Sequence, residues 1–300
     1  MALLLLAGAA ACGKRGDIIE VNVPTAAPEN TEAPVITEQP TAEPTVTEAP
    51  TEAPTAAPTE IPGPTAEPGL PDGQVLYLNT MPLDLYGVSE ADVEAWFADA
   101  VFVGDSIMLG WKNYNNNQLA GNPQFFGPTH FLCEGSYGAG HALEPVSDNS
   151  LHPLYQGQQH LLWESIKMMG AKKVFICFGL NDVAIYGVEG TANNFRTLCD
   201  NIVKESPDVK IYLISAMYLI DDSNMKALTN ANLRKLNGLL RGLCDEKGYR
   251  FIDIASHLVG PDGYLKPEYC SDNYVHQTTA AYVVWAQILR SVAARDITNN

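Results

Sequence analysis

Three short segments of this sequence carry residue types that together can transfer an acyl group. They are Gly104–Ile107, Gly179–Asp182 and Asp272–His276, and they supply in turn a serine, a side-chain amide, and an acid close to a histidine. Acyl transfer needs a nucleophile, a donor that stabilises the oxyanion, and a general base with a group that orients it. The three segments therefore predict a serine hydrolase that acts on esters.

The elements that must position these segments follow from the hydrophobic pattern, which alternates short apolar runs with amphipathic stretches. Strands that alternate with helices form a parallel sheet covered on both faces, and ligands bind outside the carboxyl ends of its strands. We therefore expect one site shared by the three segments. The predicted strands are 101–103, 131–133, 174–178, 211–214 and 250–253, and the predicted helices are 89–100, 160–169, 192–203, 224–247 and 278–294.

Ser106 directly follows the apolar run 101–103 and the Gly-Asp pair. A serine at a junction of strand and helix exposes its hydroxyl over the sheet edge, close to the positive end of the helix. This position favours a nucleophile. Alternatively, Asp105 and Ser106 only cap the helix that runs toward Asn113.

Residues 102–107, residues 178–182 and the late Asp/His pair resemble the GDSL, or SGNH, hydrolase family, and the resemblance extends over residues 97–297. It implies a flavodoxin-like three-layer α/β sandwich with a parallel sheet of about five strands. It also implies esterase or acylhydrolase activity without a metal or organic cofactor. By position, Ser106 is the expected nucleophile, His276 the general base, Asp272 its orienter and Asn181 an oxyanion donor.

The spacing of the acid differs from the family pattern. The acid usually stands three residues before the histidine, but Asn273 occupies that position and Asp272 stands four before His276. If the loop contains one extra residue, Asp272 can orient His276. Asp272 is preferred because an anion stabilises an imidazolium better than an amide does. The alternative is that Asn273 orients His276.

A glycine-rich segment, Glu134–Gly140, is the expected source of a further oxyanion donor, since the family uses a glycine N–H from this region. Gly138 and Gly140 both qualify, and Gly138 is preferred. The oxyanion would then rest on the N–H groups of Ser106 and Gly138 and on Asn181.

Two other interpretations of the sequence are possible. Ser223–Lys226 fits S-x-x-K and Ser271–Asn273 fits S-D-N, two motifs of penicillin-binding proteins, but no Lys-Thr-Gly follows them in the chain. The other alternative is a non-catalytic module that binds the cell envelope or a glycan on the same fold, and the shifted Asp272 is its main support. A lysophospholipase or thioesterase would use the same residues as the esterase.

Aromatic residues gather in the loops around the first two segments, where rings can stack on sugar faces. We therefore predict an acetyl or other short acyl ester of a carbohydrate or cell-envelope polymer as substrate. Core packing is the alternative role for these rings. They are Trp111, Tyr114, Phe125, Phe126, Tyr137 and Tyr155.

The N-terminal residues indicate an extracytoplasmic location. Residues 1–12 resemble the apolar part of a signal peptide with a lipobox, in which Cys12 is lipidated and anchors the chain to the membrane. Residues 13–72 form a predicted disordered spacer rich in Pro, Thr, Glu and Ala, because they cannot bury enough apolar surface to offset their ordering entropy. Residues 73–300 are the predicted hydrolase domain.

Charge and cysteine content exclude several classes of partner. The net charge is -17, and such an acidic chain repels nucleic acid. No C-x-x-C or H-E-x-x-H motif suggests a metal site. Cys133 and Cys270 both flank proposed site loops, so a disulfide between them is left open.

Overall fold

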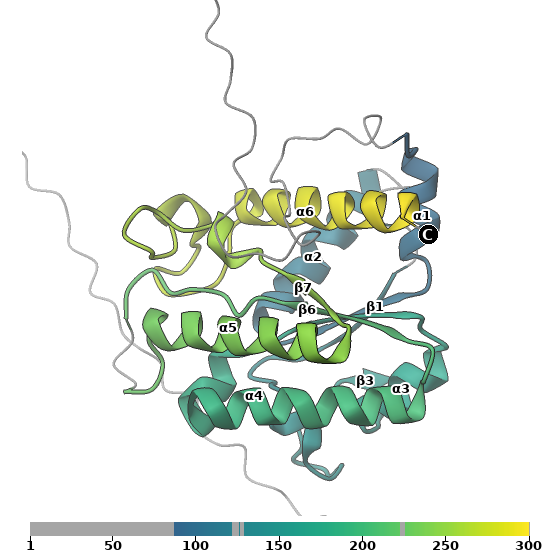
Figure 1. Cartoon of the computed structure of the whole chain (residues 1–300), viewed down its shortest axis with the longest axis horizontal. Helices are drawn as coiled ribbons and strands as arrows, with labels where there is room; N and C mark the ends of the chain where they lie inside the picture. Colours follow the sequence, from purple (N-terminus) through teal and green to yellow (C-terminus); the bar gives the residue numbers. More distant parts are fainter. Residues whose placement is uncertain (1–86, 122–125, 127–128, 223–225, 300) are drawn as a thin grey trace, which may run out of the picture. The chain divides into compact units, whose positions relative to one another are not determined.

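The computed structural model describes residues 87–299 except 122–125, 127–128 and 223–225 (Figure 1). The predicted leader with Cys12 and the predicted spacer lie outside these residues. Within the described part, no helix has the length and apolar character needed to cross a bilayer.

The predicted fold class is confirmed. Five parallel strands form one sheet in the order β2-β1-β5-β6-β7, and helices cover both faces. Counted along the chain, this is the flavodoxin-like order. The strands are β1 (Ala100–Gly104), β2 (His130–Cys133), β5 (Lys173–Cys177), β6 (Lys210–Ile214) and β7 (Arg250–Ile252).

Figure 1 shows α1, α2 and α6 over one face of the sheet and α3, α4 and α5 over the other. Within the described residues, the structure also contains a short antiparallel pair and three 3-10 turns that the sequence pattern did not predict. The helices are α1 (Glu90–Phe97), α2 (Ser106–Gly121), α3 (Leu162–Met169), α4 (Leu180–Glu205), α5 (Asn230–Lys247) and α6 (Thr279–Thr298). The smaller elements are β3 (Leu154–Tyr155), β4 (Gln158–Gln159), η2 (His141–Leu143), η3 (Ala255–His257) and η4 (Pro267–Tyr269).

Two helix starts differ from the prediction. Helix α4 begins at Leu180, well before the predicted start at residue 192, and it is kinked at Gly187, whose φ of 67° is not helical. The kink interrupts the helical periodicity of the sequence, so the pattern does not predict the turns of α4 that precede Gly187. Helix α5 begins at Asn230 rather than residue 224 because the Thr229 side chain caps it, accepting the Asn232 N–H at 3.2 Å.

Aromatic rings on one face of the sheet hold the central strands in register. Phe102, Phe175 and Tyr212 are register partners on β1, β5 and β6. Their rings stack with centroids 4.7 and 4.5 Å apart. All five residues of β1 are buried, as expected of a strand covered on both faces. This packing fixes the strand ends that carry the candidate site.

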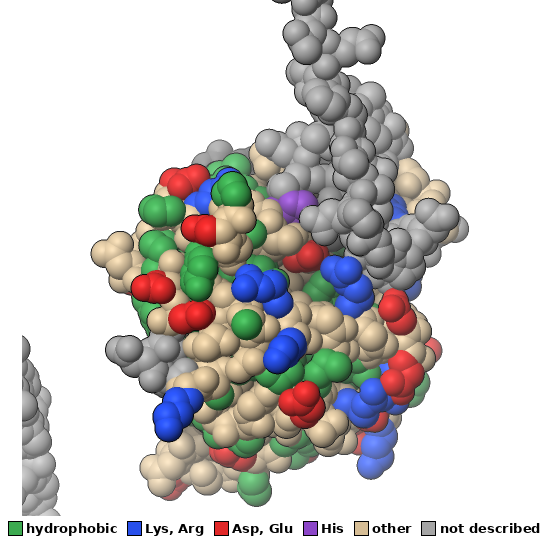
Figure 2. Space-filling view, turned by 60° about the vertical axis from the view of Figure 1, so that its left-hand side comes forward, with side chains coloured by type: hydrophobic (Ala, Val, Ile, Leu, Met, Phe, Trp, Pro, Cys, Tyr) green, Lys and Arg blue, Asp and Glu red, His purple; other side chains and the backbone are tan. Residues whose placement is uncertain are grey.

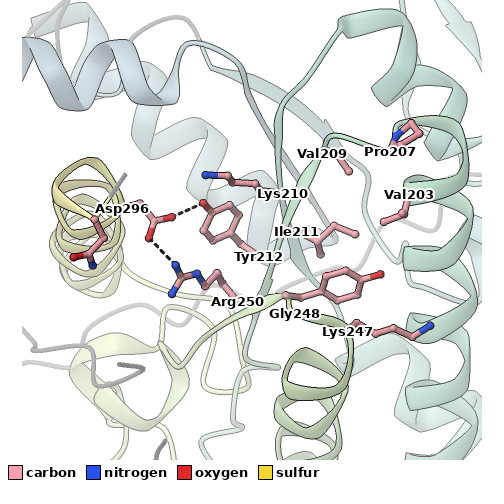
Figure 3. A pocket seen from close by; sticks show the side chains of 12 residues that line it. Val203, Pro207, Val209, Lys210, Ile211, Tyr212, Lys247, Gly248, Arg250 and Asp296 are labelled. Carbon is pink, nitrogen blue, oxygen red and sulfur yellow. Dashed lines mark hydrogen bonds and ion pairs between the residues drawn. The ribbon is translucent and has the colours of Figure 1, made fainter. Parts of the chain in front are cut away.

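A buried carboxylate ties α6 to the amino-terminal edge of the sheet. Figure 3 shows the Tyr212 hydroxyl and the Arg250 guanidinium directed at Asp296 on α6. The hydroxyl donates at 2.5 Å and Arg250 lies at 3.6 Å. A pocket of about 390 Å³ lies there, at the opposite end of the strands from the three motif segments.

Figure 2 shows one face of the molecule, on which basic and acidic side chains are interspersed and no large patch of one sign forms. A nucleic-acid surface would need clustered Lys and Arg side chains. The visible face therefore gives no support to such a partner.

We expect Tyr212→Phe to lower the free energy of unfolding by about 1–3 kcal/mol, because the buried Asp296 carboxylate loses its hydroxyl donor while the ring still stacks. Urea denaturation measures the loss. Tyr264→Phe is the matched control, since its hydroxyl lies 3.4 Å from the Asp222 carboxylate at the surface, and it should change stability little. Equal effects of the two variants would contradict the role given to the buried carboxylate.

Candidate active site

The carboxyl ends of β1 and β5 carry the first two motif segments. These strands are neighbours, and the chain leaves them on opposite sides, because β2 lies beyond β1 and β6 lies beyond β5. Such a switch point leaves a crevice where ligands bind. Ser106 is the first residue of α2 and Asn181 the second residue of α4. Asn181 therefore lies in the first turn of a helix.

A hydrogen-bonded chain connects the serine, the histidine and the acid. His276 Nε2 lies 2.9 Å from Ser106 Oγ, and His276 Nδ1 lies 2.5 Å from Asp272 Oδ2. An ionised carboxylate only accepts hydrogen bonds, so Nδ1 carries the ring proton and Nε2 presents its lone pair to the hydroxyl. In this arrangement the imidazole can accept the hydroxyl proton of Ser106 as a general base.

The loop before α6 wraps around the Asp272 carboxylate. Oδ1 accepts the N–H groups of Tyr274, Val275 and His276 at 2.9, 2.9 and 3.1 Å. Partial burial acts to raise the pKa of Asp272, but the hydrogen bonds from the His276 ring and from these N–H groups outweigh it and lower the pKa to about 2. Asp272 therefore stays ionised at neutral pH.

The extra residue between acid and histidine is taken up by a left-handed turn. Asn273 has a φ of 56°, a conformation that Asn tolerates better than most residues. This turn brings the carboxylate of Asp272 back to the His276 ring across four positions. The ring nitrogen Nδ1 has Asp272 as its partner, whereas no hydrogen bond links Asn273 to the ring within the described residues.

The candidate oxyanion donors differ in what they already bind. Asn181 Nδ2 donates to the Tyr137 carbonyl at 3.0 Å, which leaves its second N–H. The Gly140 N–H already donates to Asp182 Oδ1 at 2.8 Å. For the Gly138 N–H, no hydrogen bond is found in the described part of the chain. Of the two glycines, Gly138 is therefore the one whose N–H remains available.

Asp182 shapes the glycine segment instead of facing the substrate. Its buried carboxylate accepts the N–H groups of Ala139 and Gly140 at 3.1 and 2.8 Å. A Cβ at Gly138 would come within 2.6 Å of Asp182 Oδ2, so only glycine fits this close approach. Burial raises the pKa of Asp182, and the two N–H groups and His141 oppose that rise.

Asp105, and not Ser106, caps helix α2. Its side chain accepts the Ile107 N–H at 2.9 Å while lying almost fully buried. The Ser106 hydroxyl is thus left for His276. Burial raises the pKa of Asp105 to about 7, with the Asp182 charge adding to the rise and the Ile107 N–H and His276 opposing it.

Ser106, Asn181 and His276 line a pocket of about 540 Å³. Part of the lining is apolar, and the rest contains Ser106 and the histidines His141 and His276. The sequence assigned no role to His141, Ser136 or Tyr274, although Ser136 and Tyr274 lie inside segments that it singled out. The apolar lining is Leu151, Leu180, Ala184, Ile185, Leu228 and Val275, and the remaining lining is Asp105, Ser106, Gly135, Ser136, His141, Asn181, Tyr274 and His276.

Other sequence hypotheses fare differently. Cys133 and Cys270 are free, buried thiols, so the disulfide left open from the sequence is not formed. The N–H of Ser271 donates to the His276 carbonyl at 2.7 Å, which gives the S-D-N motif a structural role. Ser223 lies outside the described residues. Within the described residues, no group of three His, Cys, Asp or Glu side chains could hold a metal ion.

The rings predicted to stack on sugar are mostly core residues. Trp111, Phe126 and Tyr137 are fully buried, so for them the carbohydrate-stacking prediction is wrong. The reason is their packing: Trp111 and Phe126 pack edge to face, with centroids 5.2 Å apart. Tyr114 and Tyr155 are partly buried, and Phe125 lies outside the described residues.

Comparison with known sequences identifies a family for the chain. The sequence model of the GDSL-like Lipase/Acylhydrolase family matches residues 102–284, more than half of the chain. The chain belongs to this family. Members of the family are acylhydrolases and esterases, so ester hydrolysis is the chemistry that the site must be judged against. No curated protein matches the chain significantly.

Two solved structures illustrate the similarity. A GDSL-like lipase from Bacteroides thetaiotaomicron is 16% identical, with a TM-score of 0.48, and the match covers 70% of this chain and 96% of that one. A catalytic mutant of Axe2, an acetylxylan esterase from Geobacillus stearothermophilus, is 15% identical, with a TM-score of 0.47, covering 64% and 93%. Likenesses this distant say nothing about the substrate of this family member.

The raised pKa of Asp105 gives a signed prediction for stability. An unfolded Asp loses its proton near pH 4, whereas the folded one holds it to about pH 7. As the pH rises between these values, the unfolded chain releases the Asp105 proton while the folded chain keeps it. The free energy of unfolding therefore falls over this range. We expect Asp105→Asn to gain stability over the wild type from pH 4 to 7, with no further gain above. Urea midpoints across this range test it, and a pH-independent difference would contradict it.

Proposed function

We propose that this chain is a serine carboxylic ester hydrolase in which Ser106 is the nucleophile, His276 the general base and Asp272 its orienter. The single observation that carries the proposal is the His276 ring, bonded to Ser106 Oγ at 2.9 Å and to Asp272 at 2.5 Å. Family membership supplies the coarser statement, an acylhydrolase or esterase. The geometry supports the finer one, a Ser-His-Asp mechanism.

In the first half-reaction, Ser106 Oγ attacks the ester carbonyl carbon as His276 Nε2 takes the hydroxyl proton. The resulting oxyanion accepts hydrogen bonds from the Ser106 N–H and from the second N–H of Asn181, and the Gly138 N–H, which points opposite to the carbonyl that Asn181 holds, joins them only when that contact breaks. One such donor contributes on the order of 3 kcal/mol to transition-state stabilisation. His276 then gives its proton to the departing alcohol, and the acyl group remains on Ser106.

In the second half-reaction, His276 takes a proton from water as the water oxygen attacks the acyl carbon. His276 then gives this proton to Ser106 Oγ as the bond between Oγ and the acyl group breaks and the acid is released. In both halves the imidazolium forms beside Asp272. With a pKa of about 2, that carboxylate remains an anion and stabilises the positive ring.

For the substrate, we propose an ester of a short acyl group with a carbohydrate or other cell-envelope alcohol. The apolar wall at Leu180, Ala184 and Ile185 suits an acyl chain, and Leu228 extends it. Because three of the rings predicted to stack on a sugar are buried in the core, they give no support to a carbohydrate substrate. A pocket of about 540 Å³ also has room for a longer acyl chain, so a lysophospholipase or thioesterase is the second candidate.

We also propose that the enzyme works outside the cytoplasm, anchored through a lipid on Cys12. The support is the sequence alone: an apolar leader ending in small residues before Cys12, followed by the Pro-Thr spacer.

The rival reading, a non-catalytic binding module, loses its main support. It depended on the displaced acid, and the left-handed Asn273 restores contact between Asp272 and His276.

We expect Ser106→Ala and His276→Ala in the full chain to lower kcat on p-nitrophenyl acetate by at least roughly 10³-fold, because each removes a member of one catalytic unit. Ser271→Ala is the matched control and should keep the rate, since its backbone N–H, not its hydroxyl, holds the loop. A fluorophosphonate probe should label wild type and not Ser106→Ala. A wild type without turnover or labelling would favour the binding module. A series of acyl lengths, with acetylated oligosaccharides and a lysophospholipid, separates the two substrate candidates.

Asp272→Asn should lower kcat by roughly 10²–10⁴-fold, because the amide presents N–H to His276 Nδ1 and favours the wrong tautomer. Asn273→Gly should keep activity, since glycine adopts the same positive φ and no ring contact is lost. Steady-state kinetics on both variants decides which residue orients the histidine. The reverse pattern would assign that role to Asn273.

A further inference from the structure

His141 stands on a well-anchored part of the pocket lining. The N–H groups of Ala139 and Gly140, just before it, donate to the buried Asp182 carboxylate at 3.1 and 2.8 Å. The chain then enters η2, where the Leu143 N–H donates to the Gly140 carbonyl at 3.1 Å. The backbone that carries the His141 ring is therefore fixed, and the ring lines the same pocket as the proposed nucleophile.

Three histidines of this region differ in what their ring nitrogens bind. Both nitrogens of His276 are bonded within the proposed triad. Those of His152 lie 3.2 Å from the Tyr137 hydroxyl and 2.9 Å from the Glu144 carbonyl. For the ring of His141, no hydrogen bond is found among the described residues. His141 therefore has a hydrogen-bonding capacity that neither the described fold nor the proposed mechanism uses.

The two ring nitrogens of His141 differ in access. Nδ1 is buried and has no hydrogen-bond partner among the described residues, whereas Nε2 is not sealed in this way. Polar groups in a protein interior are usually paired, so an unpaired imidazole in a catalytic pocket calls for an explanation. A neutral imidazole donates or accepts through Nε2, depending on its tautomer. Nε2 is therefore the atom through which His141 can bind a ligand in the pocket.

The charges around the pocket favour a neutral polar group as that ligand. The described lining contains no Lys or Arg, the side chains that bind phosphate best. It does contain the acidic Asp105, and the Asp182 carboxylate is close enough for His141 to act to lower its pKa. An anionic headgroup would meet these acids without a permanent cation. A hydroxyl carries no charge and can both donate and accept.

This hydroxyl must belong to the alcohol part of the substrate. The short acyl group proposed above has one polar atom, the carbonyl oxygen, and the oxyanion donors bind it. The alcohol part of a sugar ester carries further hydroxyls close to the ester oxygen. A hydrogen bond from His141 can therefore distinguish one alcohol from another, but not one short acyl group from another.

We propose that His141 is a specificity-determining residue, which binds a hydroxyl of the substrate's alcohol through Nε2 and so selects sugar-like esters over esters of simple alcohols. The inference rests on the proposed function, because it names the class of alcohol that the same site accepts. A hydrogen bond between neutral groups contributes modestly, so its loss should lower kcat/KM on a hydroxylated ester by roughly 3- to 10-fold.

The test compares two acetate esters on the full chain. A monoacetylated hexose has free hydroxyls, whereas cyclohexyl acetate has a six-membered ring without any. We expect wild type to prefer the hexose ester, and His141→Leu to lower kcat/KM on that ester by the stated factor. Its kcat/KM on cyclohexyl acetate and p-nitrophenyl acetate should change less than about twofold, because neither alcohol offers a hydroxyl to lose. His141→Gln, whose amide donates and accepts, should keep more of the preference.

His160→Leu is the matched control, since it makes the same replacement at a histidine outside the pocket lining. It should leave the rates on all three esters unchanged.

Four outcomes would overturn the proposal. A wild type without preference for the hexose ester, or an unchanged hexose rate in His141→Leu, would show that no such contact forms. Equal losses on all three esters would assign His141 a structural role through Asp182. A loss confined to a lysophospholipid would assign it to a phosphate instead of a hydroxyl.

The proposed function is tested separately from this contact. A wild type that hydrolyses p-nitrophenyl acetate keeps the proposed function, whichever of these outcomes is found. A wild type that neither hydrolyses this ester nor reacts with a fluorophosphonate overturns the proposed function, and the alcohol contact with it.

Discussion

Pairing between β1 and β5 is the constraint on which the site depends. The last residues of the two strands, Gly104 and Cys177, are register partners, so the segments that follow them start side by side. Gly104 permits this closeness, because a Cβ there would come within 2.8 Å of the Cys177 carbonyl and closer still to Met108. Ser106 and Asn181 then begin helices on opposite faces of the sheet. The proposed nucleophile and the proposed amide donor therefore reach one pocket without a long loop to order.

Three carboxylates around the site do different work because their surroundings differ. Asp105 and Asp182 are buried, and burial raises the pKa of both. Each accepts backbone N–H groups and thereby shapes the turn at which a functional residue stands. Asp272 is more exposed and receives four hydrogen bonds from residues 274–276, so its pKa falls. Asp272 lies beside the His276 ring and keeps its negative charge at neutral pH, so it is the carboxylate that can stabilise an imidazolium there.

Much of this could be predicted from the sequence, because the relevant signals are local. Continuous apolar runs located all five strands of the sheet, and the three motif segments supplied every residue of the proposed triad. The preference for Asp272 over Asn273 followed from charge, and the geometry agrees with it. The turn that makes it work could not be predicted, since a left-handed Asn is a property of the folded loop.

What failed depends on long-range packing. The sequence pattern could not show that Trp111 and Phe126 meet in the core, or that Gly187 interrupts a helix already begun at Leu180. His152 gave no signal at all. Its buried ring is held by partners that lie eight and fifteen residues away in the sequence and reach it only after folding.

The kink at Gly187 divides α4 into two parts with separate duties. Residues 180–186 carry Asn181, Asp182 and the exposed apolar side chain of Ile185, whereas residues after the kink bury Phe195, Leu198 and Ile202 in the core. Changes at Ala184 or Ile185 can therefore alter the shape of the pocket while the rest of the helix keeps its packing. This separation gives the fold a place where acyl preference can diverge between relatives at little cost in folding.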